Sequence, residues 1–358
     1  MPKTATQHDI ARLAGVSHMT VSRALRGHPD VQEVTRQRIE ELAAKHGYRA
    51  NAGARAMRKG RYGALGLLMS EANERSALLP DLVAGIRTAM RSRSLHLVLG
   101  DLPDGELASN KRLPQLLQEW SVDGLIVHYT HDAPEELAEM LRRYKLPAVW
   151  TNTTRDVHCI TPDDRSAARE LAEKAFANGH RKAMYLDVIN SHHPSVPDRR
   201  DGFIGRFTEL GGSVRVRIVE PGSVWQTSPT IRAWTEETFE RLGDTTLVVS
   251  YRPVDACRVM HIAQQHGRRV PQDLSFATFS IRRELFAGLT ELAMYQVPTE
   301  RLGREAVDML CRRIDDADHN ADPKPIPAQR LPLNWIEGDT FGPAPSGSQD
   351  TIYPDRPR

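Results

Sequence analysis

Apolar residues near the start of the chain recur at the spacing of short α-helices. Their pattern predicts a helix over residues 9–14, a second helix that begins after Ser17, and a third over residues 31–46. Gly15 breaks the chain between the first two, and the Ser17 hydroxyl can cap the second by accepting from a backbone N–H group. Two short helices around a glycine turn, braced by a third, form a helix-turn-helix, whose second helix can lie in the major groove of DNA.

From residue 63 onward, short apolar strands alternate with amphipathic helices. The predicted strands cover residues 64–69, 95–100, 124–129, 147–150, 183–187, 214–219, 246–250 and 275–279. The predicted helices cover residues 80–92, 164–177, 199–210, 231–242 and 254–266. This alternation is typical of parallel sheets with helices on both faces, and two such runs predict an α/β core with two lobes. Because such sheets bind ligands beyond the carboxyl ends of their strands, we expect a site between the lobes.

The charge of the chain is unevenly distributed. The 358 residues carry a net charge of only +2 at pH 7. Residues 1–61 contain twelve Lys or Arg and five Asp or Glu, a net of +7, which leaves −5 for the remainder. A basic headpiece on a mildly acidic body is what binding a polyanion at one end requires.

Several other classes of protein receive no support. The apolar runs are far shorter than the roughly 20 residues that span a bilayer, and no apolar signal segment begins the chain, so we expect a cytoplasmic protein without a membrane span. A solute-binding protein would share the two-lobed body but would need a secretion signal and no basic headpiece. Without a phosphate-binding glycine loop, a Gly-x-Ser-x-Gly elbow or a zinc motif, we expect no enzyme.

The residues that most often bind metals are interpreted here as structural. Cys159, Cys257 and Cys311 lie far apart and show neither metal-ligand nor disulfide spacing, so they are expected to be reduced thiols in apolar surroundings. The adjacent His192 and His193 have no accompanying ligand motif and are interpreted as polar surface. We therefore predict no cofactor and no metal.

The N-terminal motif resembles the headpiece of the LacI/GalR family of bacterial transcription regulators. The similar residues are Asp9-Ile-Ala-Arg-Leu-Ala-Gly-Val-Ser17, Thr20-Val-Ser-Arg23, Gly47-Tyr48, Asn51, Ala54 and Arg55. The resemblance assigns base reading to His18, Met19 and Arg23. It assigns phosphate contacts to Ser17, Thr20 and Ser22, and we add Arg26 as a further DNA-binding cation. Arg23 can form two hydrogen bonds to a guanine, whereas Met19 can make only apolar contacts. The alternative is that Arg23 and Arg26 form a solvated basic face.

Residues 51–59 resemble the hinge of the same family, which folds into a helix on operator DNA and enters the minor groove. The hinge residues implied to bind DNA are Asn51, Arg55 and Met57, with Met57 at the position where the family usually places a leucine wedge. Gly53 disfavours a helix by about 1 kcal/mol relative to alanine, so the hinge should be more dependent on DNA for its order. The alternative is a flexible basic linker.

Landmarks in the body resemble the periplasmic-binding-protein-like core of that family. They are Val122-Asp-Gly-Leu-Ile126, Gly179-His180-Arg181, Arg199-x-x-Gly202-Phe203, Val270-Pro271-x-Asp273-Leu-Ser275 and Leu302-Gly303-Arg304. The implied domains are a helix-turn-helix domain over 1–49, a hinge over 50–61, and a core over 62–338. Within the core, lobe 1 would cover about 62–161 and 290–318, and lobe 2 about 162–289 and 319–338. Residues 339–358, rich in Pro, Gly, Ser and Asp, are predicted to form a disordered tail.

The candidate effector residues are Arg199, Trp150, Trp225, Arg252 and Ser280. Arg199 falls on the effector-binding arginine of the family, and a guanidinium can bind vicinal hydroxyls or a carboxylate, although a surface ion pair is the alternative. The two tryptophans are either ring platforms for a sugar or core residues. Arg252-Pro253 stands where the family usually has Asn-Asp, and Ser280 stands where it commonly has Asp. The loss of acidic groups and the gain of Arg252 favour an acidic ligand such as a sugar acid or phosphosugar over a neutral sugar.

The sequence is therefore interpreted as a ligand-controlled DNA-binding regulator, a repressor. Two protomers would form a homodimer on near-palindromic, double-stranded operator DNA, with the paired hinges bending its centre. A sugar, sugar acid or phosphosugar bound between the lobes would change operator affinity. The alternative is a regulator of the same architecture with a non-sugar effector or none. Whether the effector induces or co-represses, and whether a tetramer forms, stays open.

Overall fold

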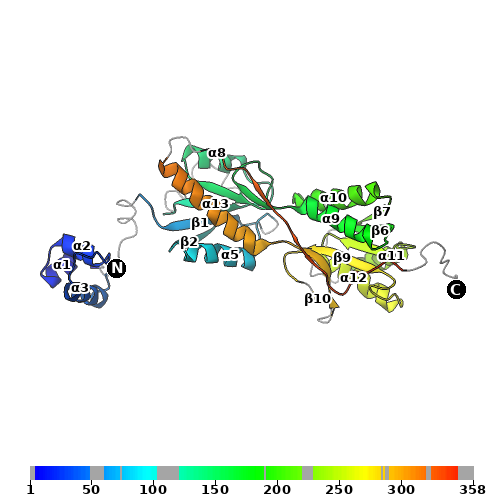
Figure 1. The fold of residues 1–358 in the computed structure, drawn as a ribbon, viewed down its shortest axis with the longest axis horizontal. Helices are drawn as coiled ribbons and strands as arrows, with labels where there is room; N and C mark the ends of the chain where they lie inside the picture. The colour runs from blue at the N-terminus through cyan, green and yellow to red at the C-terminus, as the bar shows by residue number, and fades with distance from the viewer. Residues whose placement is uncertain are drawn as a thin grey trace. The chain divides into compact units, whose positions relative to one another are not determined.

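The computed structural model describes residues 5–48, 60–72, 75–102, 121–188, 191–219, 229–283, 285–286, 290–319 and 324–345. Its contacts divide the chain into two compact units, Met1–Gly63 and Ala64–Arg358 (Figure 1). In the described ranges, no helix has the length and apolar character needed to cross a membrane.

The first unit contains the three predicted headpiece helices, α1 (Gln7–Ala14), α2 (His18–Ala24) and α3 (Glu33–Lys45). The Thr6 hydroxyl caps α1 while the Asp9 carboxylate accepts from the Thr6 backbone, which satisfies donors that a helix start leaves free. Gly15 ends α1 at φ 64°, a left-handed conformation that glycine adopts without strain. Ser17 then caps α2, as predicted, by accepting from the Thr20 backbone N–H at 3.0 Å. One apolar cluster joins the three helices, centred on Ile10, Val21, Ala24 and Ile39.

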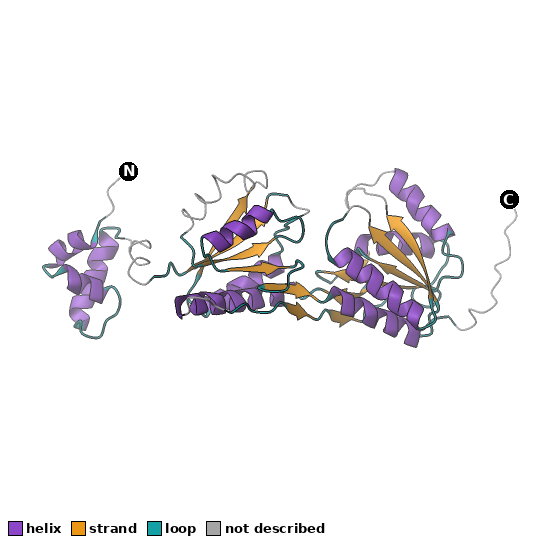
Figure 2. Cartoon of the chain, turned by 90° about the horizontal axis from the view of Figure 1, so that it is seen from above, coloured by secondary structure: helices purple, strands orange, loops and turns teal. Residues whose placement is uncertain are grey.

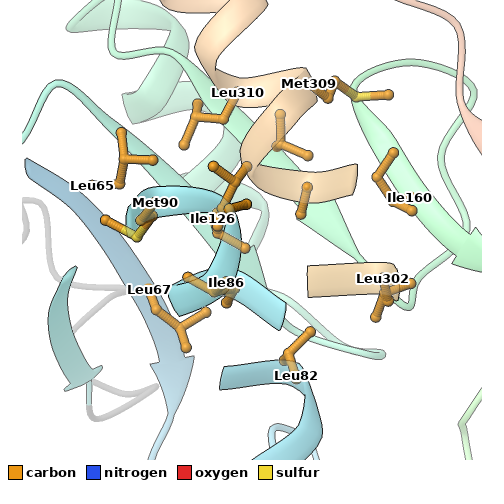
Figure 3. Packing of buried hydrophobic residues seen from close by; sticks show 14 of the residues in the cluster. Leu65, Leu67, Leu82, Ile86, Met90, Ile126, Ile160, Leu302, Met309 and Leu310 are labelled. Atoms are coloured by element: carbon orange, nitrogen blue, oxygen red, sulfur yellow. The ribbon is translucent and has the colours of Figure 1, made fainter. Parts of the chain in front are cut away.

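The first sheet of the core has six parallel strands in the order β13-β5-β4-β3-β1-β2. They are β1 (Ala64–Ser70), β2 (His96–Leu102), β3 (Gly124–His128), β4 (Ala148–Thr151), β5 (Cys159–Pro162) and β13 (Gln329–Leu331). The helices of this lobe are α5 (Pro80–Arg91), α8 (Glu135–Arg143) and α13 (Thr299–His319). Alternate side chains of β1 enter opposite layers: Leu65 and Leu67 pack with α5 and α13 (Figure 3), and Leu68 packs with α8.

Helices α5 and α13 approach so closely that glycine is required at their contact. A Cβ atom on Gly85 would overlap the backbone of Glu300, and one on Gly303 would overlap the backbone of Leu82. The close approach places the length of α13 against the first sheet, with Leu302 and Leu310 in the same cluster as Leu65.

The second sheet has the order β14-β12-β9-β8-β6-β7, parallel except for β14 against β12. Its strands are β6 (Lys182–Val188), β7 (Ser213–Val219), β8 (Leu247–Ser250), β9 (Ser275–Ser280), β12 (Ala293–Gln296) and β14 (Asn334–Ile336). The helices of this lobe are α9 (Asp164–Ala177), α10 (Ser195–Glu209), α11 (Pro229–Glu240) and α12 (Pro253–Gln265). Helices α9 and α10 cover one face and α11 and α12 the other (Figure 2). A two-residue ladder pairs β10 (Leu285–Phe286) with β11 (Thr290–Glu291).

The predicted fold class, a helical headpiece followed by two parallel-sheet lobes, is confirmed. The predicted lobe boundaries differ from the observed ones. Strand β12 lies in the second sheet rather than in lobe 1, and β13 lies in the first sheet rather than in lobe 2. Within the described residues, the chain therefore passes between the lobes three times: after β5, between β12 and α13, and between β13 and β14. Sequence patterns identify a strand but not the sheet that accepts it, because pairing is decided by tertiary contacts.

Residues 339–345 pack on lobe 2, so the prediction of a disordered tail from residue 339 was wrong for this segment. The Thr340 carbonyl accepts from the backbone N–H of Phe276 at 2.7 Å, and its hydroxyl bonds Ala293 N at 3.0 Å. The carbonyl of Gly342 lies 3.0 Å from Nε2 of the buried His180. A composition rich in Pro and Gly indicated disorder, but these contacts satisfy the backbone groups of the segment. Residues 346–358 lie outside the described part.

Candidate DNA-binding and effector sites

Helix α2 presents one face to solvent while the other packs on the headpiece core. Val21 and Ala24 are buried, whereas Ser17, Met19 and Arg23 are exposed. The Met19 side chain is 59% exposed. His18 and Thr20 are partly exposed. Five of the predicted DNA-binding residues thus share one accessible surface, which we call the recognition face (Ser17, His18, Met19, Thr20, Arg23).

Ser22 and Arg26 occupy positions that differ from the expectation. Ser22 is only 2% exposed, and its hydroxyl accepts from Nη2 of Arg26 at 2.9 Å. The Nε of Arg26 donates to the Ser22 carbonyl at 2.7 Å, so this exposed guanidinium satisfies groups near the C-terminal end of α2. The Ser22 hydroxyl is therefore buried and engaged by Arg26 in this structure, and its assigned phosphate contact stays a prediction.

Arg23 has only a loose partner in the headpiece. Its Nη1 lies 4.0 Å from Oδ2 of Asp30, and both side chains are largely exposed. Exposed pairs of this kind contribute about 0–1 kcal/mol, so a nucleic acid can compete for the guanidinium.

The sequence analysis missed two headpiece residues that contact the recognition face or the loop beside it. The ring of His8 stacks on that of His18, with centroids 4.3 Å apart and planes 16° apart. Arg36 donates from Nη2 to the carbonyls of His28 and Val31, at 3.0 and 3.2 Å, and so fixes the loop that follows α2. Neither contact has a sequence signature, since each joins different elements.

Four predicted site residues lie outside the described residues: the hinge residues Asn51, Arg55 and Met57, and Trp225 of the core. Their assigned roles stay predictions.

Arg199 lies at the carboxyl edge of the second sheet and is buried in an ion pair. Helix α10 begins at Ser195, so Arg199 lies one turn inside it rather than at its start. The side chain is about nine-tenths buried, and its Nε donates to Oδ1 of Asp164, the first residue of α9, at 2.7 Å. Its guanidinium carbon lies 5.0 Å from the centre of the Tyr251 ring and 4.8 Å from that of Phe279. We call Asp164, Arg199, Tyr251 and Phe279 the arginine cluster.

The charge of Arg199 is secured by its partner. Burial by itself would lower the pKa of this guanidinium, but the adjacent Asp164 carboxylate raises it above its usual value. The pair is thus an oriented but electroneutral group. It is not the surface ion pair that was the alternative to an effector role.

The other arginines near this edge are also paired with buried carboxylates. Nη1 of Arg200 donates to Asp187 at 3.1 Å. Arg252 forms two hydrogen bonds to Asp255, at 2.7 and 3.2 Å, and the Asp255 side chain is almost fully buried. Asp255 also accepts from Nη1 of Arg258 at 3.1 Å, so one buried carboxylate is shared by two guanidinium groups. The expectation that Arg252 makes the site cationic stays a prediction.

Trp150 and Ser280 are both buried at strand ends. Trp150 belongs to the apolar cluster beneath α8, and the guanidinium carbon of Arg155 lies 3.7 Å from its ring centre. Of the two readings for this residue, the core position is the one observed. The Ser280 hydroxyl, at the end of β9, accepts from the backbone N–H of Arg282 at 3.3 Å.

Polar side chains from the two lobes meet beside the arginine cluster. The side-chain amide of Asn152, which follows β4, lies 3.2 Å from Nε2 of His193 in lobe 2. Nδ1 of His193 lies 2.7 Å from the Ser195 hydroxyl, which lies 2.9 Å from the Tyr251 hydroxyl. His193 is thus a partly buried contact between lobes, not the polar surface residue expected, and burial above all lowers its pKa to about 3.

A second contact between the lobes lies at the edge of this group. Nδ1 of the exposed His192 lies 2.8 Å from Oδ2 of Asp132, and this contact lowers the pKa of the aspartate. Within the described ranges, no group of three or more His, Cys, Asp or Glu side chains is arranged to hold a metal ion.

Tyr185 on β6 brings a further polar group towards the arginine cluster. Its hydroxyl is buried, and among the described residues it has no hydrogen-bond partner. Burial raises the pKa of this phenol, so it remains a neutral donor. The sequence analysis missed Tyr185, Asn152, Asp164 and Tyr251. The position of the last three directly after strands could have identified them, since that is where ligand-binding residues collect in such sheets.

Two family models match the regions built above. The model described as bacterial regulatory proteins, lacI family, matches residues 6–51, which contain all three headpiece helices. The model of a periplasmic binding protein-like domain matches residues 172–341. The resemblance to the lacI family on which the sequence analysis relied is confirmed, and the headpiece and core together match a DNA-binding transcription regulator of this type.

Named relatives agree along most of the chain. The ribose operon repressor of Bacillus subtilis (strain 168) is 26% identical over 306 residues, covering 86% of this chain and 90% of the repressor. The transcriptional regulator PtxS of Pseudomonas plecoglossicida is 28% identical over 342 residues, covering 92% of each. A solved structure of the lac repressor dimer, bound to operator and the anti-inducer ONPF, matches with a TM-score of 0.74 over 94% of this chain and 99% of that one. At 21% identity, this last similarity shows the shared fold.

Proposed function

We propose that this LacI-family chain is a repressor that binds near-palindromic operator DNA as a homodimer and responds to a small molecule bound between the lobes of its core. The recognition face of α2 carries the proposal. It combines an exposed methionine, a loosely paired arginine and capping hydroxyls on a helix whose opposite face is fixed in the headpiece core. This is the arrangement by which a recognition helix offers side chains to base edges in the major groove.

The roles of the individual residues follow from their exposure. Arg23 reads a guanine, Met19 contacts a thymine methyl, and His18 donates to or accepts from a base edge. Ser17 and Thr20 bind phosphate and set the register. Asn51, Arg55 and Met57 are proposed to act from the hinge, with Met57 as a wedge in the minor groove. The headpiece of a second protomer would read the other half-site, as dimers of this motif do.

The effector is proposed to be a sugar, a sugar acid or a phosphosugar. The relatives include a ribose operon repressor, and one similar solved structure is a CelR–cellobiose complex. The hydroxyls and paired arginines at the edge of the second sheet suit a polar ligand. Arg199 is paired with Asp164, whereas Arg252 shares the single carboxylate of Asp255 with Arg258, so acidic and neutral sugars are both included in the proposal.

Binding-site selection with the full chain and random duplexes tests the DNA-binding role. Selection should enrich a near-palindromic sequence, and Arg23→Ala should lose about 1–3 kcal/mol of operator binding and relax base preference at one position of each half-site. The control is Arg38→Ala, on α3, which removes the same charge from the headpiece and should leave the preference at every position intact. Failure to enrich any sequence would contradict the proposal.

A thermal-shift panel tests the effector proposal on the same protein. Neutral sugars, sugar acids and sugar phosphates are compared, since a ligand that binds only the folded state raises the melting temperature. A shift with one class names the effector class. A response only to compounds outside the panel, or to none, would favour the alternative of a non-sugar effector or no effector.

A further inference from the structure

Four polar side chains form a continuous hydrogen-bonded path from lobe 1 to the arginine cluster of lobe 2. Asn152 contacts Nε2 of His193, Nδ1 of His193 contacts the Ser195 hydroxyl, and that hydroxyl contacts the hydroxyl of Tyr251. The Tyr251 ring lies against the Arg199 guanidinium. We call Asn152, His193, Ser195 and Tyr251 the relay.

The donors and acceptors of the relay require a neutral His193. The backbone N–H of Ser195 donates to Nδ1 of His193 at 3.1 Å, and a backbone N–H can only donate. Nδ1 is therefore unprotonated, and the ring proton is on Nε2, facing Asn152. The structure places Nδ2 of Asn152 at this nitrogen. A half-turn of the amide group exchanges its nitrogen and oxygen, and the oxygen then accepts this proton.

The remaining hydroxyls then have one consistent direction. Ser195 donates to Nδ1 of His193 and accepts from the Tyr251 hydroxyl. The Tyr251 proton is thereby used, and the remaining lone pairs of its oxygen are available to accept from a ligand hydroxyl. A proton added at Nδ1 of His193 would face the N–H of Ser195 and break this order.

We propose that His193 is a positioning residue that joins the arrangement of the lobes to the effector site, and that its protonation releases lobe 2 from Asn152 of lobe 1. The proposal rests on the proposed function, because it describes regulation of the same effector site. In the closed arrangement, neutral His193 holds Asn152 on one side and orients Ser195 and Tyr251 on the other. Once protonated at Nδ1, it presents a second donor to the backbone N–H of Ser195 and carries a charge in a partly buried position, and both effects disfavour this arrangement.

The charged groups around His193 all oppose its protonation. Arg199 acts from its own helix, and the rings of His131 and His128 act from lobe 1, with the His131 ring centre 6.3 Å away. The adjacent His192 contacts Asp132 through Nδ1 at 2.8 Å rather than a member of the relay. The two histidines can therefore be separated experimentally by substituting one at a time.

Linkage gives the expected size of the effect. The pKa of His193 is lowered to about 3 in the observed arrangement. If opening of the lobes returns the pKa of this histidine to about 6.5, lowering the pH from 8 to 5 raises the population of the open arrangement relative to the closed one by roughly 30-fold. Acid therefore favours opening.

Pulsed electron–electron double resonance, which measures the distance between two spin labels, tests this proposal on the full chain without DNA or effector. Spin labels are attached through an unnatural ketone-bearing residue at Lys145 of lobe 1 and Glu240 of lobe 2, both exposed, and the labelled chain is diluted with unlabelled chain. The wild-type protein should show one interlobe distance at pH 8 and a second, more open population at pH 5. Far-UV circular dichroism at both pH values verifies that the chain remains folded.

Three variants separate the relay from its surroundings. His193→Gln, which cannot be protonated, should give the same distances at pH 5 and pH 8. Asn152→Ala, which removes the lobe 1 partner, should show the open population already at pH 8. The matched control is His192→Gln, in the same loop, which should keep the acid response.

The outcomes that overturn the proposal are distinct. Identical wild-type distances at both pH values would show that no acid-driven opening exists. An acid response that survives in His193→Gln, or disappears in His192→Gln, would assign it to another group. If Asn152→Ala has the same interlobe distance as the wild type at pH 8, Asn152 does not hold the two lobes together. None of these results depends on operator binding, so they are separate from a failure of the site selection.

Discussion

The headpiece and the core use arginine in opposite ways. Arg23 in the headpiece is exposed, and its carboxylate partner is 4.0 Å away. Arg199 in the core is buried, bonded to Asp164 at 2.7 Å and enclosed by two aromatic rings. The first guanidinium is available to a polyanion that arrives from solution, whereas the second already has its counter-charge. The headpiece therefore offers an accessible positive charge at Arg23, whereas the core holds Arg199 in a fixed orientation with its charge compensated.

This difference predicts unequal energetic consequences for the two regions. An exposed pair is screened by water and contributes little to stability. A buried guanidinium that loses its partner keeps the desolvation cost without compensation. The same chemical change, the loss of one aspartate, should thus be severe in the core and minor in the headpiece.

The largest effect is expected for Asp164→Ala. Removing the carboxylate leaves Arg199 buried and unpaired, which should destabilise the core by about 3–5 kcal/mol. Urea unfolding followed by far-UV circular dichroism measures this loss in the transition of the core. The control is Glu209→Gln on α10, whose exposed carboxylate contacts Arg206 and Arg169 and whose loss should not shift the transition. Equal stability of Asp164→Ala and wild type would contradict the contrast drawn here.

The next effect concerns acid. Burial lowers the pKa of His180 to about 4, so between pH 6.5 and pH 4 the unfolded chain binds a proton that the folded core does not. Stability must then fall as the pH decreases through this window, by up to about 3 kcal/mol for this residue. The quantity to measure is the loss of unfolding free energy between pH 7.5 and pH 4.5, which should be smaller in His180→Gln than in the wild type. Parallel pH profiles would refute the assignment.

The smallest effect is expected in the headpiece. Asp30→Asn removes the loose partner of Arg23 and one negative charge near the recognition face, so operator affinity should rise by about 0.5 kcal/mol, roughly twofold. Fluorescence anisotropy on a selected operator at low and high salt measures it, and the gain should shrink as salt increases. A loss of affinity would mean that Asp30 orients Arg23 instead of competing for it.

Local patterns predicted the elements of this protein well. Each strand predicted between residues 64 and 279 is present within two residues at either end, and the capping roles of Gly15 and Ser17 are observed. Helix α10 begins four residues earlier than expected, because Pro194 and the residues after it form a first turn without an apolar periodic signal. Short strands late in the chain, β13 and β14, were not predicted, since three residues carry no period.

For the candidate sites, the sequence predicted individual residues but not the partners that they contact. The exposed face of α2 follows from helix periodicity, which also placed Val21 and Ala24 inside. The partners were not predicted, because Asp164 is 35 residues from Arg199 and Gly342 is 162 residues from His180. Spacing along one element predicts neighbours, but ion pairs and hydrogen bonds between distant segments are fixed only when the lobes assemble.

The three passages of the chain between the lobes also determine the order in which the protein is completed during synthesis. The headpiece is finished once Tyr48, three residues after α3, has emerged from the ribosome, since no later described residue belongs to its apolar cluster. Neither lobe is finished until much later, because the first sheet waits for α13 and β13 and the second for β14. A nascent chain can therefore carry a folded helix-turn-helix well before it has any part of the core in final form.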